Sequence, residues 1–170
     1  RIQIDAHADL RDELDGEPYS HACAIARSLD EGALAVHQVG IRAYCRQEAN
    51  RIENDHRIHT WFARDIMSPC TGSKAWSGWL ESIKNIDGPV HLTVDIDGLD
   101  GALVPATGTP VPGGLTFWHA VETIETVFAN CQVISADVNE IVPQVETPLT
   151  QFTAAMIATK IAAAHIASLR

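Results

Sequence analysis

The chain alternates between short apolar runs rich in β-branched residues and longer segments whose apolar residues recur at helical spacing. The first kind predicts strands at residues 1–4, 35–44, 58–62, 90–97 and 133–141. The second kind predicts helices at residues 20–32, 50–53, 73–86, 116–128 and 149–168. Strands that alternate with helices indicate βαβ units and a mainly parallel sheet. The pattern therefore predicts an α/β fold, and residues 1–170 are expected to form a single domain.

Composition narrows the class of protein. The chain has 170 residues, 46% of them hydrophobic, which suffices for one domain with a substantial core. No apolar run approaches the roughly 18 to 20 residues of a membrane span. A net charge of −10 argues against nucleic acid as a partner. We expect a soluble, cytoplasmic protein, with its four cysteines as small buried residues rather than disulfides or zinc ligands.

Two carboxylates stand at the end of one predicted strand, in Val94-Asp95-Ile96-Asp97-Gly98. Residues two apart on a strand face the same way, and open α/β sheets place ligands at the carboxyl ends of their strands. A divalent cation would relieve the repulsion between two such acids. A solvated turn, a helix-capping role, or the Asp-x-Asp-Gly opening of haloacid-dehalogenase phosphatases would fit these residues equally well.

A second cluster follows the first predicted strand, where Asp5, His7 and Asp9 alternate with alanines. An extended backbone presents all three on one face. Carboxylates together with imidazole suit a transition metal such as manganese better than calcium. A strand that simply runs into a polar loop is the alternative.

Three further features are candidates for the same site. His21 lies in the first turn of a predicted helix, where it could be a catalytic residue or a capping or surface residue. The loop at 98–114 is rich in proline and glycine and follows a strand end, as loops that line sites do. Glu140 lies near the end of the last predicted strand.

Five motifs occur in order along nearly the whole chain: Asp-Ala-His-Ala-Asp at 5–9, Ser-His-Ala at 20–22, Val-Asp-Ile-Asp at 94–97, Thr-Gly-Thr-Pro-Val-Pro-Gly-Gly at 107–114 and Asp-Val-Asn-Glu at 137–140. Together they resemble the ureohydrolases, the arginase and agmatinase family. The details from Asp9 to His21 are more similar to microbial agmatinases than to arginases. This resemblance displaces the phosphatase alternative, which would need a different downstream set of residues.

The resemblance implies a three-layer α-β-α fold and two Mn²⁺ ions per active site. It implies hydrolysis of a small guanidino substrate, most similar to the conversion of agmatine to putrescine and urea, by a metal-bridged hydroxide. Asp5 and Asp95 would bridge the metals, His7 and Asp97 would bind the second, and Asp9 would bind the first. The metal ligands implied are Asp5, His7, Asp9, Asp95 and Asp97; the catalytic residues are Asp9, His21 and Glu140, of which His21 and Glu140 also bind substrate.

The family takes a further histidine ligand from an upstream Gly-Gly-Asp-His segment, which the sequence does not contain. We therefore expect an N-terminally truncated arginase-like fold with an open sheet edge beside its last strand. One of the two metals is then expected to bind weakly. The alternatives are an inactive metal-binding or oligomer-interaction protein, and a hydrolase of guanidinobutyrate or arginine. A homo-oligomer without membrane or nucleic-acid partners is expected in each case.

Overall fold

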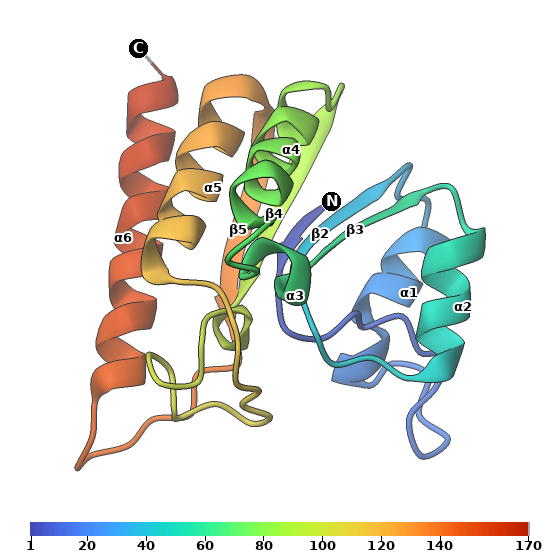
Figure 1. Cartoon of the computed structure of the whole chain (residues 1–170), viewed down its shortest axis with the longest axis horizontal. Coiled ribbons are helices and arrows are strands. Elements are labelled where there is room, and N and C mark those ends of the chain that lie inside the picture. The colour runs from blue at the N-terminus through green and yellow to red at the C-terminus, as the bar shows by residue number, and fades with distance from the viewer. Residues whose placement is uncertain (170) are drawn as a thin grey trace.

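The computed structural model describes residues 1–169 and contains one five-stranded sheet (Figure 1). Its strands are β1 (Ile2–Ile4), β2 (Val36–Ile41), β3 (Ile58–Phe62), β4 (Pro89–Asp95) and β5 (Gln132–Asn139). The strand order is β3-β2-β1-β4-β5, and every neighbouring pair is parallel. The predicted parallel α/β sheet is confirmed, and β1 and β4 lie side by side at its centre.

Helices cover both faces of the sheet. They are α1 (Ala24–Asp30), α2 (Arg46–Asn54), α3 (Ala63–Ile66), α4 (Gly72–Lys84), α5 (Phe117–Asn130) and α6 (Leu149–Ser168), with 3₁₀ turns η1 (His21–Cys23) and η2 (Ile96–Gly98). The long helices α4, α5 and α6 pack side by side on one face, while α1 and α2 lie on the other (Figure 1). These layers confirm the three-layer arrangement.

Two apolar cores follow from this layering. The larger core packs Ile2, Ile4 and Leu92 of the central strands against Trp79 of α4 and Ile124 of α5. The smaller core joins residues of α1, β2 and β3 on the opposite face. Because side chains alternate along a strand, Gln3, Asp5, Thr93 and Asp95 point away from the larger core.

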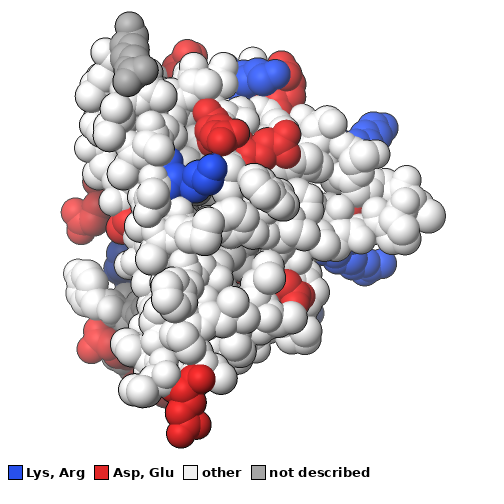
Figure 2. All heavy atoms as spheres, turned by 90° about the vertical axis from the view of Figure 1, so that its left-hand side faces the viewer, with Lys and Arg blue, Asp and Glu red and all other residues white. Residues whose placement is uncertain are grey.

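Strand β5 forms one edge of the sheet. It pairs with β4, and no other strand of residues 1–169 pairs with it, as expected for an open edge. The surface over β5 and α6 carries few charges (Figure 2). Ile134, Phe152 and Met156 are exposed there.

Some local expectations were wrong. Helix α2 spans Arg46–Asn54 rather than 50–53, and α3 was not predicted, because both have too few apolar residues to show a clear period. All four cysteines are free thiols, as expected, but only Cys23 is buried: Cys45 and Cys131 are partly exposed, and Cys70 is exposed. Within residues 1–169, none of the helices has the length and hydropathy needed to cross a membrane.

Candidate metal centre

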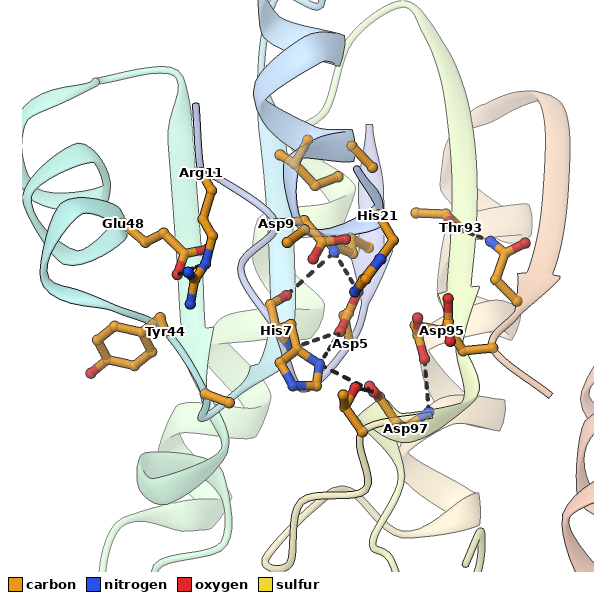
Figure 3. Close-up of a pocket in the computed structure, with 18 of the residues that line it drawn as sticks. Asp5, His7, Asp9, Arg11, His21, Tyr44, Glu48, Thr93, Asp95 and Asp97 are labelled. Atoms are coloured by element: carbon orange, nitrogen blue, oxygen red, sulfur yellow. Dashed lines mark hydrogen bonds and ion pairs between the residues drawn. The ribbon is translucent and has the colours of Figure 1, made fainter. Parts of the chain in front are cut away.

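The acidic residues meet at the carboxyl ends of β1 and β4. A cavity of about 770 Å³ opens there (Figure 3). Every site residue predicted from the sequence lines it: Asp5, His7, Asp9, His21, Asp95, Asp97 and Glu140. Segments distant in sequence are thus brought together, because the central strands β1 and β4 are neighbours and parallel.

Three of these residues form a compact cluster. One ligand atom from each of Asp5, His7 and Asp97 lies within 4.8 Å of the other two. His7 Nδ1 is 3.1 Å from Asp97 Oδ2 and 3.6 Å from Asp5 Oδ1. Asp5 and Asp97 are almost fully buried, at 3% and 1% exposed. Two carboxylates and an imidazole are therefore held at a spacing suited to a single cation.

Backbone groups fix the carboxylates on both strands. The amide of Ala6 donates to Asp97 Oδ1 at 3.1 Å, which ties η2 to the segment after β1. Asp95 Oδ1 accepts the amide of Asp97 at 3.0 Å and so caps η2. The helix-capping alternative for this motif is thus also true of Asp95, which caps η2 and lines the cavity as well.

Asp9 has a left-handed backbone, with φ of 53°. This conformation is uncommon outside glycine and costs free energy. Here the carbonyl of Asp9 accepts hydrogen bonds from the amides of Ile25 and Ala26, both at 3.1 Å. The start of α1 thus holds Asp9 in the turn, and its side chain lines the cavity (Figure 3).

Two glycines allow the backbone to close around Asp5. A Cβ on Gly98 would lie 2.7 Å from the amide nitrogen of Asp5, and one on Gly40 would lie 2.9 Å from its carbonyl oxygen. Gly40 also has φ of 96°. The glycine after Asp97 is therefore required for close approach to β1 as well as for a turn.

Burial and mutual repulsion dominate the electrostatics of the carboxylates. Desolvation, followed by the charge of Asp5, raises the pKa of Asp9 to about 9. Desolvation, followed by the charges of Asp5 and Asp97, raises the pKa of Asp95 to about 10. Desolvation also raises the pKa of Asp5, to about 6. Several negative charges cannot be held together here without a compensating cation.

His7 provides part of that compensation. Its hydrogen bonds with Asp5 and Asp97 raise its pKa to about 10. Burial alone would raise the pKa of Asp97, but the hydrogen bond and charge of His7 outweigh burial and lower it. In the absence of a metal, a proton on His7 therefore balances one of the carboxylates.

His21 and Glu140 lie at the rim of the cavity. His21 is in η1 and has an exposed side chain that reaches the cavity beside Asp9 (Figure 3). Glu140 follows β5 with φ of 60°. Its Oε2 lies 3.2 Å from the position a Cβ on Gly108 would occupy, so the loop at 98–114 packs against this carboxylate.

The sequence patterns missed several residues of this site. Buried Glu48 of α2 accepts the amides of Leu10 at 3.1 Å and Cys45 at 2.8 Å. Thr109, in the loop at 98–114, lies 3.4 Å from Asp97 Oδ2. Glu48 could have been suspected from its place at the third position of a polar helix, where acidic residues bind free amides.

Comparison with known proteins agrees with this geometry. Residues 1–164 match the Arginase family. An N(1)-aminopropylagmatine ureohydrolase of Synechocystis is 35% identical over 162 residues, which cover 94% of this chain and 50% of that protein. An agmatinase of Pyrococcus horikoshii is 33% identical over 140 residues, covering 82% and 46%.

Among solved structures, the agmatine ureohydrolase of Thermoplasma volcanium superposes with a TM-score of 0.82 and 27% identity. That match covers 97% of this chain and 54% of the other. The chain shares its parallel α/β fold with that structure and belongs to the arginase family. It spans about half the length of the curated relatives it matches.

Proposed function

We propose that this chain carries the metal centre of a ureohydrolase that converts a guanidino compound to urea and an amine. The observation that carries the proposal is the convergence of four carboxylates and His7 on one cavity at the centre of the sheet. Membership of the arginase family supports the same reaction class.

The residues fit manganese as the resident metal. Desolvation and mutual repulsion raise the pKa values of Asp9 and Asp95 to about 9 and about 10, so the site favours added positive charge. Carboxylate oxygens with one imidazole form a donor set suited to Mn²⁺. The ligands in this proposal are Asp5, His7, Asp9, Asp95 and Asp97. Bound manganese would supply Lewis acidity, which lowers the pKa of water to near neutrality.

The remaining residues position the substrate and move protons. Glu140 carries a carboxylate at the cavity rim, where it can pair with a planar guanidinium through two hydrogen bonds. His21 lies on the same rim and can donate a proton to the leaving amine. Asp9 faces the cavity beside the other proposed metal ligands and can also orient the attacking water.

For the substrate we favour agmatine. The matched relatives include an agmatinase and an N(1)-aminopropylagmatine ureohydrolase, which are named for amine-tailed guanidines. The test is urea release from agmatine, N(1)-aminopropylagmatine, 4-guanidinobutyrate and arginine, each with added Mn²⁺. The expected result is measurable urea from the amine-tailed substrates, and preference for a carboxylate-tailed one would overturn the substrate assignment.

A matched pair of variants tests the assignment of the site. Asp97→Asn keeps the size of a buried residue but removes its charge, and should abolish manganese binding and urea release. Asp87→Asn makes the same change at an exposed position and should preserve both. A folded chain that binds no manganese and releases no urea would contradict the proposed function.

A further inference from the structure

A row of polar side chains crosses β1, β2 and β3. On β1 it lies two residues before Asp5 and therefore on the same face of the sheet. Gln3 of β1 is the register partner of Gln38 on β2, which in turn is the partner of Thr60 on β3. Gln3 is 1% exposed and Gln38 is 0% exposed. Two buried amides in a sheet interior are costly unless each polar atom has a partner.

These side chains form a chain of hydrogen bonds that ends on the metal centre. Thr60 Oγ1 donates to Gln38 Oε1 at 3.0 Å. Gln38 Nε2 donates to Gln3 Oε1 at 2.6 Å. Gln3 Nε2 then donates to Asp5 Oδ2, also at 2.6 Å. We call Thr60, Gln38 and Gln3 the amide relay.

The direction of the amide relay is fixed by the backbone. Gln38 Nε2 also donates to the carbonyl of Ala8 at 2.8 Å, and Gln3 Nε2 lies 3.5 Å from the carbonyl of His7. A carbonyl can only accept, so a flip of either amide would place two acceptors in contact. Each glutamine must therefore present its nitrogen toward the acidic segment.

We propose that Gln3 and Gln38 are positioning residues, which hold the Asp5 carboxylate in the orientation that binds manganese. Gln3 holds Asp5 Oδ2, while the amide of His7 holds Oδ1 at 2.6 Å. Both oxygens are fixed, so the plane of the carboxylate is set by the protein. Hydrogen bonds to metal ligands commonly change metal affinity by about 10- to 100-fold. This inference rests on the proposed function, because it assigns Asp5 to the metal.

Gln38 gives the sharper test because it acts on Asp5 through Gln3. Methionine matches glutamine in length without its polar atoms, so we compare Gln3→Met, Gln38→Met and the double variant. Manganese affinity is measured by titration calorimetry. Gln3→Met should weaken binding about tenfold or more. Gln38→Met should weaken it by a smaller factor. The loss in the double variant should be smaller than the sum of the two single losses, because Gln38 acts on Asp5 through Gln3, and only its separate bond to the Ala8 carbonyl is then left to lose.

A control variant on the opposite face of the sheet separates a loss of metal affinity from a general loss of stability. Trp79 Nε1 donates to Thr123 Oγ1 at 2.9 Å, and both residues are fully buried away from the cavity. Thr123→Val should lower the free energy of unfolding without changing manganese affinity. Unchanged affinity in both glutamine variants, or fully additive losses in the double variant, would overturn the proposal. Thr60→Val, which removes only a hydroxyl, replaces Gln38→Met if that variant does not fold.

A metal-free measurement distinguishes failure of the amide relay from failure of the proposed function. The amide proton of His7 is bound to Asp5, so its hydrogen exchange reports how firmly Asp5 is held. Gln3→Met and Gln38→Met should speed this exchange about tenfold in the metal-free protein, and Thr123→Val should not. If hydrogen exchange at His7 is the same in both glutamine variants as in the wild-type protein, the amide relay is wrong. If the wild-type protein takes up no manganese while the variants still exchange faster, only the proposed function is wrong.

Discussion

The guanidinium of Arg42 donates a hydrogen bond of 2.8 Å to the backbone carbonyl of Asp97. The same group donates to the carbonyls of Leu99 at 3.1 Å and Val111 at 2.6 Å. Arg42 follows β2, so one half-buried side chain ties the end of that strand to both ends of the loop at 98–114. Asp97 therefore depends on a residue that does not face the cavity.

Arg42→Lys is expected to weaken manganese binding about tenfold and to cost about 2–4 kcal/mol of stability. An ammonium cannot reach several carbonyls in one plane, so some of them would lose their partner. Titration calorimetry and urea unfolding measure the two effects. Arg64→Lys, at an exposed position of α3, is the control and should change neither. Wild-type affinity in Arg42→Lys would show that Asp97 needs no such support.

Each chain should hold one Mn²⁺ ion tightly and a second ion only weakly. Asp5, His7 and Asp97 form the compact cluster with the imidazole, whereas the neighbouring position has only the carboxylates of Asp5, Asp9 and Asp95. Elemental analysis after dialysis checks the ratio. His7→Ala should remove the tight ion and Asp9→Asn should keep it; two tightly held ions would refute this asymmetry.

Without metal, the stability of the protein should fall as pH rises. Asp9 and Asp95 keep protons in the folded state up to about pH 9 and about pH 10, but lose them near pH 4 when unfolded. The folded state binds more protons across that window, which costs about 1.4 kcal/mol per pH unit for each extra proton. His7, with a pKa raised to about 10, acts in the same direction above about pH 6.5.

Urea unfolding in EDTA between about pH 6 and about pH 9 measures this slope. Added Mn²⁺ should flatten it, because the metal binds the deprotonated acids and releases protons on binding. Asp95→Asn should reduce the slope in EDTA. A stability that rises with pH in the metal-free protein would contradict the raised pKa values.

His21→Ala should slow urea release about a hundredfold while the chain keeps its manganese. The side chain lies at the cavity rim and is not among the clustered ligand atoms. Rate measurements at saturating substrate, paired with metal analysis, separate these effects. His56→Ala, an exposed histidine in the turn before β3, is the control. Loss of metal from His21→Ala would make it a ligand instead.

Substrate binding by Glu140 should depend on the space that Gly108 leaves beside it. Glu140→Gln removes the charge that pairs with a guanidinium and should raise KM by about ten- to a hundredfold. Gly108→Ala should raise KM in the same direction, because its Cβ would lie 3.2 Å from Glu140 Oε2. Gly101→Ala, whose Cβ would meet only ordinary contact at 3.8 Å, is the control. If all three variants keep the KM of the wild-type protein, Glu140 does not bind the substrate.

The sequence alone predicted the parallel α/β class and the residues of the candidate centre. Alternation along the chain and the strand-end positions of Asp5 and Asp95 are local properties, so they can be read without coordinates. The same is true of His21 and Glu140, which were found through motifs. Helix α3 and the true start of α2 were not predicted, because such short helices have too few apolar residues to show a helical period.

Only the tertiary structure decided which groups hold those residues in place. Gln3 and Gln38 stand 35 residues apart and meet through strand register, while Arg42 reaches Asp97 from 55 residues away. No local pattern encodes such pairs, because the order β3-β2-β1-β4-β5 and the path of the loop bring them together. The candidate ligands could therefore be predicted from the sequence, whereas the residues that hold them in place could be found only in the folded chain.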